Sequence, residues 1–162
     1  MKKLFTFFIS LLLLLSCGKQ QEPQQNGSDS DNSSSQEPIE ELSAMYKGSV
    51  FVVFNEQEFE TQDIEVKFSK DDENNSTLSL YKVKFVPQMP VTIDLDVPGV
   101  SYEKREDCYI LTGNGIVPTM GGNPFDKYTA TDISGVATKD ALSFSLNFGI
   151  YPTRYEGRRI AE

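Results

Sequence analysis

The stretch ALSFSLNFGIY, residues 141–151, decides the fold class. Its apolar side chains recur at every second position, with Ser or Asn between the first four: Leu142, Phe144, Leu146, Phe148 and Ile150. A period of two places successive side chains on opposite faces of a strand. The stretch therefore predicts a β-strand with one face in a core and the other in water, as antiparallel sheets allow.

The same period recurs in the rest of the chain after residue 42. IEVKF (64–68) places Ile64, Val66 and Phe68 on one face, and VTIDLDV (91–97) does the same with Val91, Ile93, Leu95 and Val97. TLSLYKVKF (77–85) changes phase, which predicts a bulge near Tyr81-Lys82. Further strands are predicted near residues 50–54, 100–104, 108–117, 128–138 and 155–159. Turn signals such as Asn55-Glu56, Pro98-Gly99 and Lys139-Asp140 separate these short strands, which is typical of a barrel or a sandwich.

The N-terminus MKKLFTFFISLLLLLSC (1–17) has the layout of a secretory signal peptide. Two lysines precede about twelve apolar residues, whereas a membrane-spanning helix needs roughly 20. Leu14-Leu15-Ser16-Cys17 resembles a bacterial lipobox. The resemblance implies that residues 1–16 are removed by cleavage between Ser16 and Cys17, and that a diacylglyceryl group is attached to the Cys17 sulfur. Because two or three acyl chains anchor a protein stably, we expect a membrane-bound lipoprotein.

Residues 17–41 are predicted to be a lipidated cysteine followed by a disordered polar tether. From Gly18 to Glu41 the segment contains no aromatic residue and a single aliphatic one, Ile39. Such a segment buries too little apolar surface to offset its conformational entropy. As a flexible coil it spans about 25–30 Å root-mean-square. The expected location is the bacterial cell envelope, at the outer membrane, facing either the periplasm or the cell surface.

Composition excludes several classes of function. The chain has 15 Lys and Arg against 24 Asp and Glu, and loss of the two signal lysines leaves 13 against 24, a net charge of −11. This acidity argues against nucleic-acid binding. Since the chain has no His, we expect no zinc site and no Ser-His-Asp or Cys-His catalysis. With Cys17 lipidated, no disulfide to Cys108 is expected, and residues 42–162 are predicted to form one monomeric, cofactor-free domain.

The domain resembles the calycin-like β-barrel family of bacterial lipoproteins. The resemblance rests on the lipobox, the polar tether, Tyr46-Lys47-Gly48 at the start, Tyr155-Glu156-Gly157 at the end, and the central block 91–115. It implies an all-β fold: an antiparallel up-and-down barrel of about eight strands, distantly similar to lipocalins. The family supplies no catalytic residues, so the resemblance does not imply an enzyme.

Two stretches have features of ion-binding loops, but both are better interpreted as connections. KDDENNS (70–76) offers acidic oxygens but lacks the spacing and the distal Glu of a calcium loop, so a hairpin turn is preferred. GNGIVPTMGGNPF (113–125) is rich in glycine, but no helix follows that would hold a phosphate, so a long loop is preferred. Neither stretch predicts a metal or phosphate site.

Carboxylate pairs are the remaining candidates for catalysis. Asp94, Asp96, Glu103 and Asp107 would need to face each other about 5–10 Å apart to cleave a glycoside. Asp94 and Asp96 are predicted on the wet face of their strand, whereas a catalytic acid needs an apolar pocket. We therefore expect no enzyme. Arg158-Arg159 is predicted to cap an edge strand.

The 11 Phe and 7 Tyr residues allow two interpretations. An eight-stranded barrel encloses just enough space for side chains or for one small ligand. In the first interpretation the barrel holds a small apolar or amphipathic ligand, with a lid over residues 120–128 formed by Met120, Gly121, Gly122, Phe125 and Tyr128. In the second the rings fill a solid barrel, Phe125 belongs to its core, and the loops contact a protein or a glycan. The sequence leaves both open.

Overall fold

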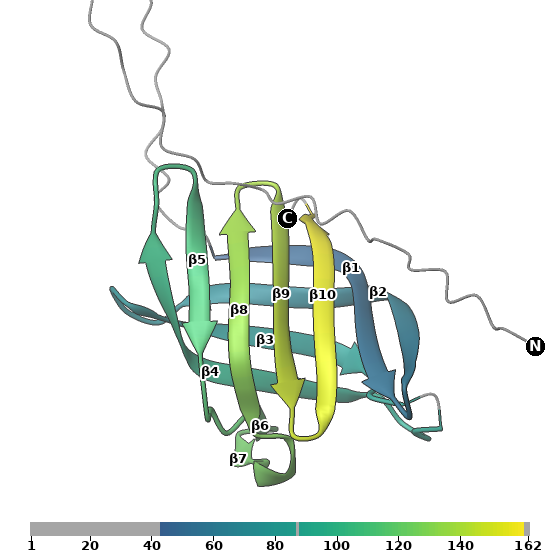
Figure 1. Cartoon of the computed structure of the whole chain (residues 1–162). Coiled ribbons are helices and arrows are strands. Elements are labelled where there is room, and N and C mark those ends of the chain that lie inside the picture. Colours follow the sequence, from purple (N-terminus) through teal and green to yellow (C-terminus); the bar gives the residue numbers. More distant parts are fainter. Residues whose placement is uncertain (1–42, 87, 161–162) are drawn as a thin grey trace, which may run out of the picture. The chain divides into compact units, whose positions relative to one another are not determined.

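The computed structural model describes residues 43–86 and 88–160, which form strands and one short 3-10 helix (Figure 1). The elements are β1 (Ala44–Phe54), β2 (Gln57–Lys70), β3 (Asn75–Val83), β4 (Ile93–Lys104), β5 (Cys108–Gly113), β6 (Thr119–Met120), β7 (Asn123–Pro124), η1 (Asp126–Tyr128), β8 (Ala130–Thr138), β9 (Ala141–Phe148) and β10 (Tyr151–Arg159). In this part of the chain no helix has the length and apolarity needed to cross a membrane. The predicted signal peptide, Cys17 and the tether lie outside the described residues.

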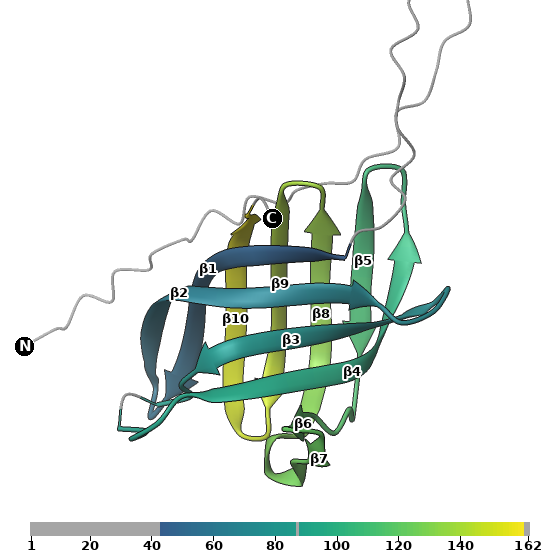
Figure 2. The ribbon, with the colours of Figure 1, turned by 180° about the vertical axis from the view of Figure 1, so that it is seen from behind.

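Eight of the strands close into a barrel. Each pairs antiparallel with the next along the chain, in the order β1, β2, β3, β4, β5, β8, β9 and β10, and β10 pairs with β1. The short β6–β7 hairpin attaches to β4 through one pair, Asp96 with Thr119. Strands β1–β4 cross over β5 and β8–β10 at a large angle (Figure 2). The predicted antiparallel up-and-down barrel of eight strands is confirmed.

The two ends of the barrel differ in their connections. At one end, here called the turn end, β1 begins and the connections are short: residues 71–74, 105–107 and 139–140. At the other end, here called the loop end, the connections are residues 55–56, 84–92, 114–129 and 149–150. The loop end includes β6, β7 and η1 and lies along the lower edge of Figure 1. Two long connections therefore meet at the loop end.

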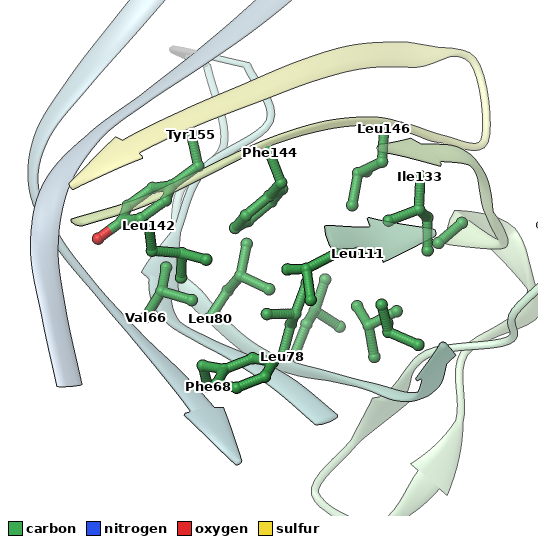
Figure 3. Packing of buried hydrophobic residues seen from close by; sticks show 14 of the residues in the cluster. Val66, Phe68, Leu78, Leu80, Leu111, Ile133, Leu142, Phe144, Leu146 and Tyr155 are labelled. Atoms are coloured by element: carbon green, nitrogen blue, oxygen red, sulfur yellow. The ribbon is translucent and has the colours of Figure 1, made fainter. Parts of the chain in front are cut away.

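The alternating residues of β9 face the core, as predicted. Leu142, Phe144 and Leu146 are buried, whereas Ser145 between them is exposed. Figure 3 shows these three side chains directed toward Val66 of β2 and others from across the barrel. The predicted inward faces of β2 and of β4 from Leu95 onward are buried as well. The period of two thus identified most of the core.

Two residues predicted to face inward are exposed instead. Ile150 is 81 % exposed because β9 ends at Phe148 and Gly149-Ile150 forms the turn into β10. Val91 is 60 % exposed because β4 begins only at Ile93. In both cases the alternating pattern extends past the end of the strand, where the backbone no longer holds side chains against the core.

The strand boundaries correct the sequence interpretation in two further places. The predicted turn at Pro98-Gly99 is a bulge within the single strand β4, where the pairing with β3 shifts and Gly99 has φ +72°. The strand expected at residues 155–159 extends back to Tyr151 as the full strand β10. The bulge expected near Tyr81-Lys82 is confirmed, since the β3–β4 pairing shifts between Leu80 and Val83 and Lys82 has φ +57°.

The first and last strands close the barrel through two facing glycines. Gly48 pairs with Gly157, and a Cβ on Gly48 would lie 1.9 Å from the Glu156 carbonyl oxygen. A Cβ on Gly157 would lie 2.1 Å from the hydroxyl of Tyr155, whose ring is fully buried. The motifs Tyr46-Lys47-Gly48 and Tyr155-Glu156-Gly157 therefore lie side by side where the barrel closes.

Candidate functional site

The interior of the barrel is occupied by side chains. The aromatic residues that are buried to 2 % exposure or less come from six strands or loops and are Tyr46, Phe68, Phe85, Tyr109, Phe148 and Tyr155. In the middle of the barrel the rings of Phe144 and Tyr155 stack with centroids 5.3 Å apart. Two hollows stand out along the described residues, and both open on the outer surface. The arrangement is that of a packed core.

Aromatic rings also close the loop end. We call this group the aromatic plug; it consists of Phe54, Phe85, Phe125, Tyr128, Phe148 and Tyr151. Phe85 lies at its centre. The centroid of its ring is 4.6 Å from the centroid of the Tyr128 ring and 5.0 Å from that of the Phe148 ring. Phe85, Phe125 and Tyr128 lie in the two long connections, so side chains of the loops themselves pack together at the loop end.

The predicted lid residues divide into an exposed tip and a packed base. At the tip, Met120 is 41 % exposed and Gly121 and Gly122 form the β6–β7 turn. At the base, Tyr128 is 7 % exposed and Phe125 is partly buried against the core, with ring centroids 4.9 Å apart. The structure thus brings Phe125 and Tyr128 into the aromatic plug and leaves the other three in solvent.

The more apolar of the two hollows is a groove on the outer flank of β8, β9, β10, β1 and the start of β2, with a volume of about 260 Å³. We call it the flank groove; its lining is Phe51, Val53, Glu58, Asp132, Ser145, Leu146, Asn147, Pro152, Thr153 and Arg154. Figure 1 shows these neighbouring strands together. The sequence interpretation missed this site. Its signal was the stretch GSVFVVF (48–54), which is apolar at outward as well as inward positions.

Arg154 is held in place at the centre of the flank groove. Its guanidinium carbon lies 3.9 Å from the centroid of the Phe51 ring, which is within the range of a cation–π contact. It forms ion pairs with Glu156 and, at 3.6 Å, with Glu58. At the other side of the groove, the Asp132 carboxylate accepts a 2.8 Å hydrogen bond from the Asn147 side-chain amide. The groove therefore combines an apolar base with carboxylate oxygens at its margins.

The buried tyrosines differ in how their hydroxyl groups are satisfied. The Tyr46 hydroxyl donates to the Thr138 carbonyl oxygen at 2.9 Å, and burial raises the pKa of Tyr46 to about 12. Burial also raises the pKa of Tyr155. The Tyr109 hydroxyl is the one buried side-chain oxygen or nitrogen of the described residues that has no hydrogen-bond partner. Tyr109 packs against Tyr102 and Phe68 near the turn end.

The acidic stretch 70–76 forms a hairpin turn that uses its own carboxylate. Asp72 Oδ1 accepts from the backbone N–H groups of Asn74 and Asn75, each at 2.8 Å, and the Asn75 side-chain amide also donates to this carboxylate. The Asn75 side chain and then these N–H groups lower the pKa of Asp72. Within residues 43–86 and 88–160, no three His, Cys, Asp or Glu side chains are grouped so as to hold a metal ion.

The four candidate carboxylates do not meet in one site. Asp94 and Glu103 are nine residues apart on β4, which corresponds to roughly 30 Å. Asp94 accepts a 2.8 Å hydrogen bond from the Lys82 N–H and so stabilises the β3 bulge. Glu103 pairs with Arg105 at 2.9 Å, and Asp107 is exposed in the turn between β4 and β5.

A comparison with models of known protein families, with curated proteins and with solved structures finds no match for this chain. The resemblance to calycin-like lipoproteins therefore stays a prediction, and the candidate site is defined by the geometry alone.

Proposed function

We propose that this chain is a lipid-anchored lipoprotein of the bacterial cell envelope, without enzymatic activity, whose solid barrel is a scaffold for binding a protein or a glycan on its outer surface. The observation that supports this most is the packed interior, with the aromatic plug at the loop end. A barrel whose core and mouth are filled by its own side chains has its recognition surface outside. The proposal follows the second interpretation of the Phe and Tyr residues, in which the rings fill a solid barrel, and not the first, in which the barrel holds a ligand.

The flank groove is the surface that we assign to the partner. Its base offers Phe51, Pro152 and the stem of Arg154, and its margins offer Glu58 and Asp132. The Arg154 charge is already compensated by two carboxylates. A segment with one apolar side chain next to a basic or amide group would fit these surroundings, because the apolar group would cover Phe51 while Asp132 accepts a hydrogen bond.

Photo-crosslinking in cells tests this assignment. A photoreactive amino acid in place of Ser145, which is exposed in the groove, should give a discrete crosslinked product. The same amino acid in place of Thr112, exposed on β5, is the matched control and should give none. The product should also disappear when Asp132→Lys reverses the charge at the margin. Identical patterns from positions 145 and 112 would contradict a partner in the flank groove.

A small ligand inside the barrel is the second candidate, and the Tyr109 hydroxyl is the observation that favours it. A buried hydroxyl without a partner costs roughly 1–3 kcal/mol, which a polar atom of a bound molecule would offset. For the solid scaffold we expect native mass spectrometry of the purified protein to give the mass of the chain alone. A co-purifying molecule that is lost in Tyr109→Phe would establish the container instead.

The proposed anchor rests on Cys17, outside the described residues. We expect Cys17→Ala to abolish incorporation of a labelled fatty acid and to leave an uncleaved precursor in the inner membrane. Ser16→Ala, which keeps a small residue before the cysteine, should still be labelled and processed. Undiminished label on Cys17→Ala would show that the chain is not lipidated at this position.

A further inference from the structure

The exposed large hydrophobic side chains of the described residues lie at the loop end. Among the described residues these are Ile150 (81 % exposed), Val91 (60 %), Met120 (41 %), Val53 (37 %) and Val117 (37 %). We call them the apolar rim. They lie within or next to all four connections of this end, which meet along the lower edge of Figure 1. Single exposed apolar residues are common on proteins, but their collection at one end of a barrel is a surface feature.

The connections of the same end carry no net charge, although the chain is acidic. The four connections of the loop end contain two acidic residues, Glu56 and Asp126, and two basic residues, Lys84 and Lys127, whereas residues 114–125 and 149–150 contain no charged residue. At the turn end, by contrast, the connections contain Asp71-Asp72-Glu73, Arg105-Glu106-Asp107 and Lys139-Asp140. The connections are therefore polar and net acidic at the turn end, whereas at the loop end they carry the apolar rim and no net charge.

We infer that the apolar rim inserts shallowly into the bilayer to which the chain is anchored. The side chains are apolar and not aromatic, and they lie in or beside four different connections, so they can enter the lipid interface at separate points. Because its connections carry no net charge, the loop end avoids the repulsion that the acidic turns would meet at an anionic lipid surface. A protein partner would instead be expected to contact exposed aromatic residues or arginine, whereas the rings at this end belong to the aromatic plug.

The length of chain outside the structure permits this orientation. Barrel residues begin at Ala44, at the turn end, so 26 residues separate Cys17 from it. Their composition predicts a flexible chain of about 28 Å root-mean-square, and the eight residues of β9 span roughly 26 Å. The anchor can therefore reach past the barrel wall while the loop end contacts the bilayer. Tethering supplies an effective concentration in the millimolar range, which makes even a weak contact sufficient.

This inference rests on the proposed lipid anchor, and fluorescence of the acylated protein in vesicles tests it. An environment-sensitive dye is attached to Gln88→Cys, which is exposed beside the rim and leaves its apolar residues intact, or to Lys139→Cys at the turn end. In phosphatidylethanolamine–phosphatidylglycerol vesicles, the dye at position 88 should shift to shorter wavelength and be quenched by nitroxide lipids. The dye at position 139 should keep its emission in water.

Charged substitutions in the rim give the decisive comparison. Val91→Asp with Ile150→Asp should lower the docked fraction at least tenfold, while the protein stays bound to the vesicles through its acyl chains. Both residues are more than half exposed, so the barrel should keep its fold, which circular dichroism checks. Acylation is read separately from the mass of the protein. A mass without acyl chains would contradict the proposed lipid anchor. In that case the dye-labelled protein, mixed with an excess of vesicles, would still test whether the apolar rim enters lipid.

Three outcomes would overturn the inference. A dye at position 88 that keeps its emission in water on vesicle-bound protein would show that the rim does not enter lipid. A shift that also occurs in detergent and rises with protein concentration would assign the rim to a second copy of the chain. A shift that appears only after addition of a cell-envelope extract would assign it to a protein partner.

Discussion

At the scale of single residues, Gly157 shows how closely the barrel closure is packed. Any Cβ at this position would overlap the Tyr155 hydroxyl, at 2.1 Å. That hydroxyl belongs to a fully buried ring that stacks on Phe144. The missing side chain of Gly157 therefore leaves the space that the Tyr155 ring occupies.

We expect Gly157→Ala to lower the free energy of unfolding by roughly 1–3 kcal/mol, because the added methyl group forces the Tyr155 ring or the β1–β10 pairing to move. Urea denaturation of the purified protein measures this. Ser145→Ala, an exposed change on the neighbouring strand β9, is the control and should change stability by less than about 0.5 kcal/mol. A Gly157→Ala protein as stable as the wild type would mean that the closure has free space.

At the scale of strands, the alternating sequence predicted the core of β9 because each strand position leaves only two directions for a side chain. Phe144 and Leu146 were identified in this way. The position of Ile150 was predicted wrongly, because an apolar residue at this position does not show that β9 has ended two residues earlier. The alternation could not locate the turn, since Gly149 between Phe148 and Ile150 preserves the pattern of apolar positions.

We expect Phe144→Ala to cost about 3–5 kcal/mol of stability, because it removes a buried ring and leaves a cavity next to Tyr155. Thermal and urea unfolding measure this cost. Ser145→Ala, at the next position, changes a side chain that is exposed to solvent, so it should leave the free energy of unfolding nearly unchanged. Equal losses at positions 144 and 145 would show that the assigned faces of β9 are wrong.

The candidate site was less predictable from the sequence than the core, because its residues come from segments that lie far apart in the chain. The aromatic plug combines Phe85, Tyr128 and Tyr151 from three separate connections or strand ends. Irregular backbone has no period that shows which side chains meet. Similarly, Phe51 and Arg154 meet in the flank groove only because β10 lies beside β1, a pairing between the first and last strands that no local pattern indicates.

At the scale of the whole molecule, ionisation of the buried tyrosines limits stability at high pH. Burial raises the pKa of Tyr46 to about 12 and raises the pKa of Tyr155 as well. An unfolded chain releases these protons near pH 10. The native state therefore holds them more tightly, and stability is retained below pH 10 but falls as the pH rises toward 12.

We expect the contribution of these tyrosines to the free energy of unfolding to be nearly constant from pH 8 to 9.5. Above pH 10 this contribution should fall steeply, because the tyrosines of the unfolded chain ionise first. The Tyr46 shift alone corresponds to roughly 3 kcal/mol by complete ionisation. Urea titrations at pH 8, 10 and 11 measure the effect. Tyr46→Phe, which also loses the hydrogen bond to Thr138, should be less stable at pH 8 and decline less above pH 10. Equal slopes for both proteins would exclude Tyr46 as a source of the alkaline loss.

Pairing of β1 with β10 also determines when the fold can be completed. Tyr46 pairs with Arg159 and Val52 with Thr153, so one edge of β1 has no neighbour until the last strand is present. During export in which the N-terminus emerges first, the preceding strands would wait as an open sheet with two bare edges, which are sites of aggregation. Pairing across so long a sequence separation is slow. Completion of this fold therefore depends on the arrival of β10, and until then the exposed edges of the early strands can pair with other chains.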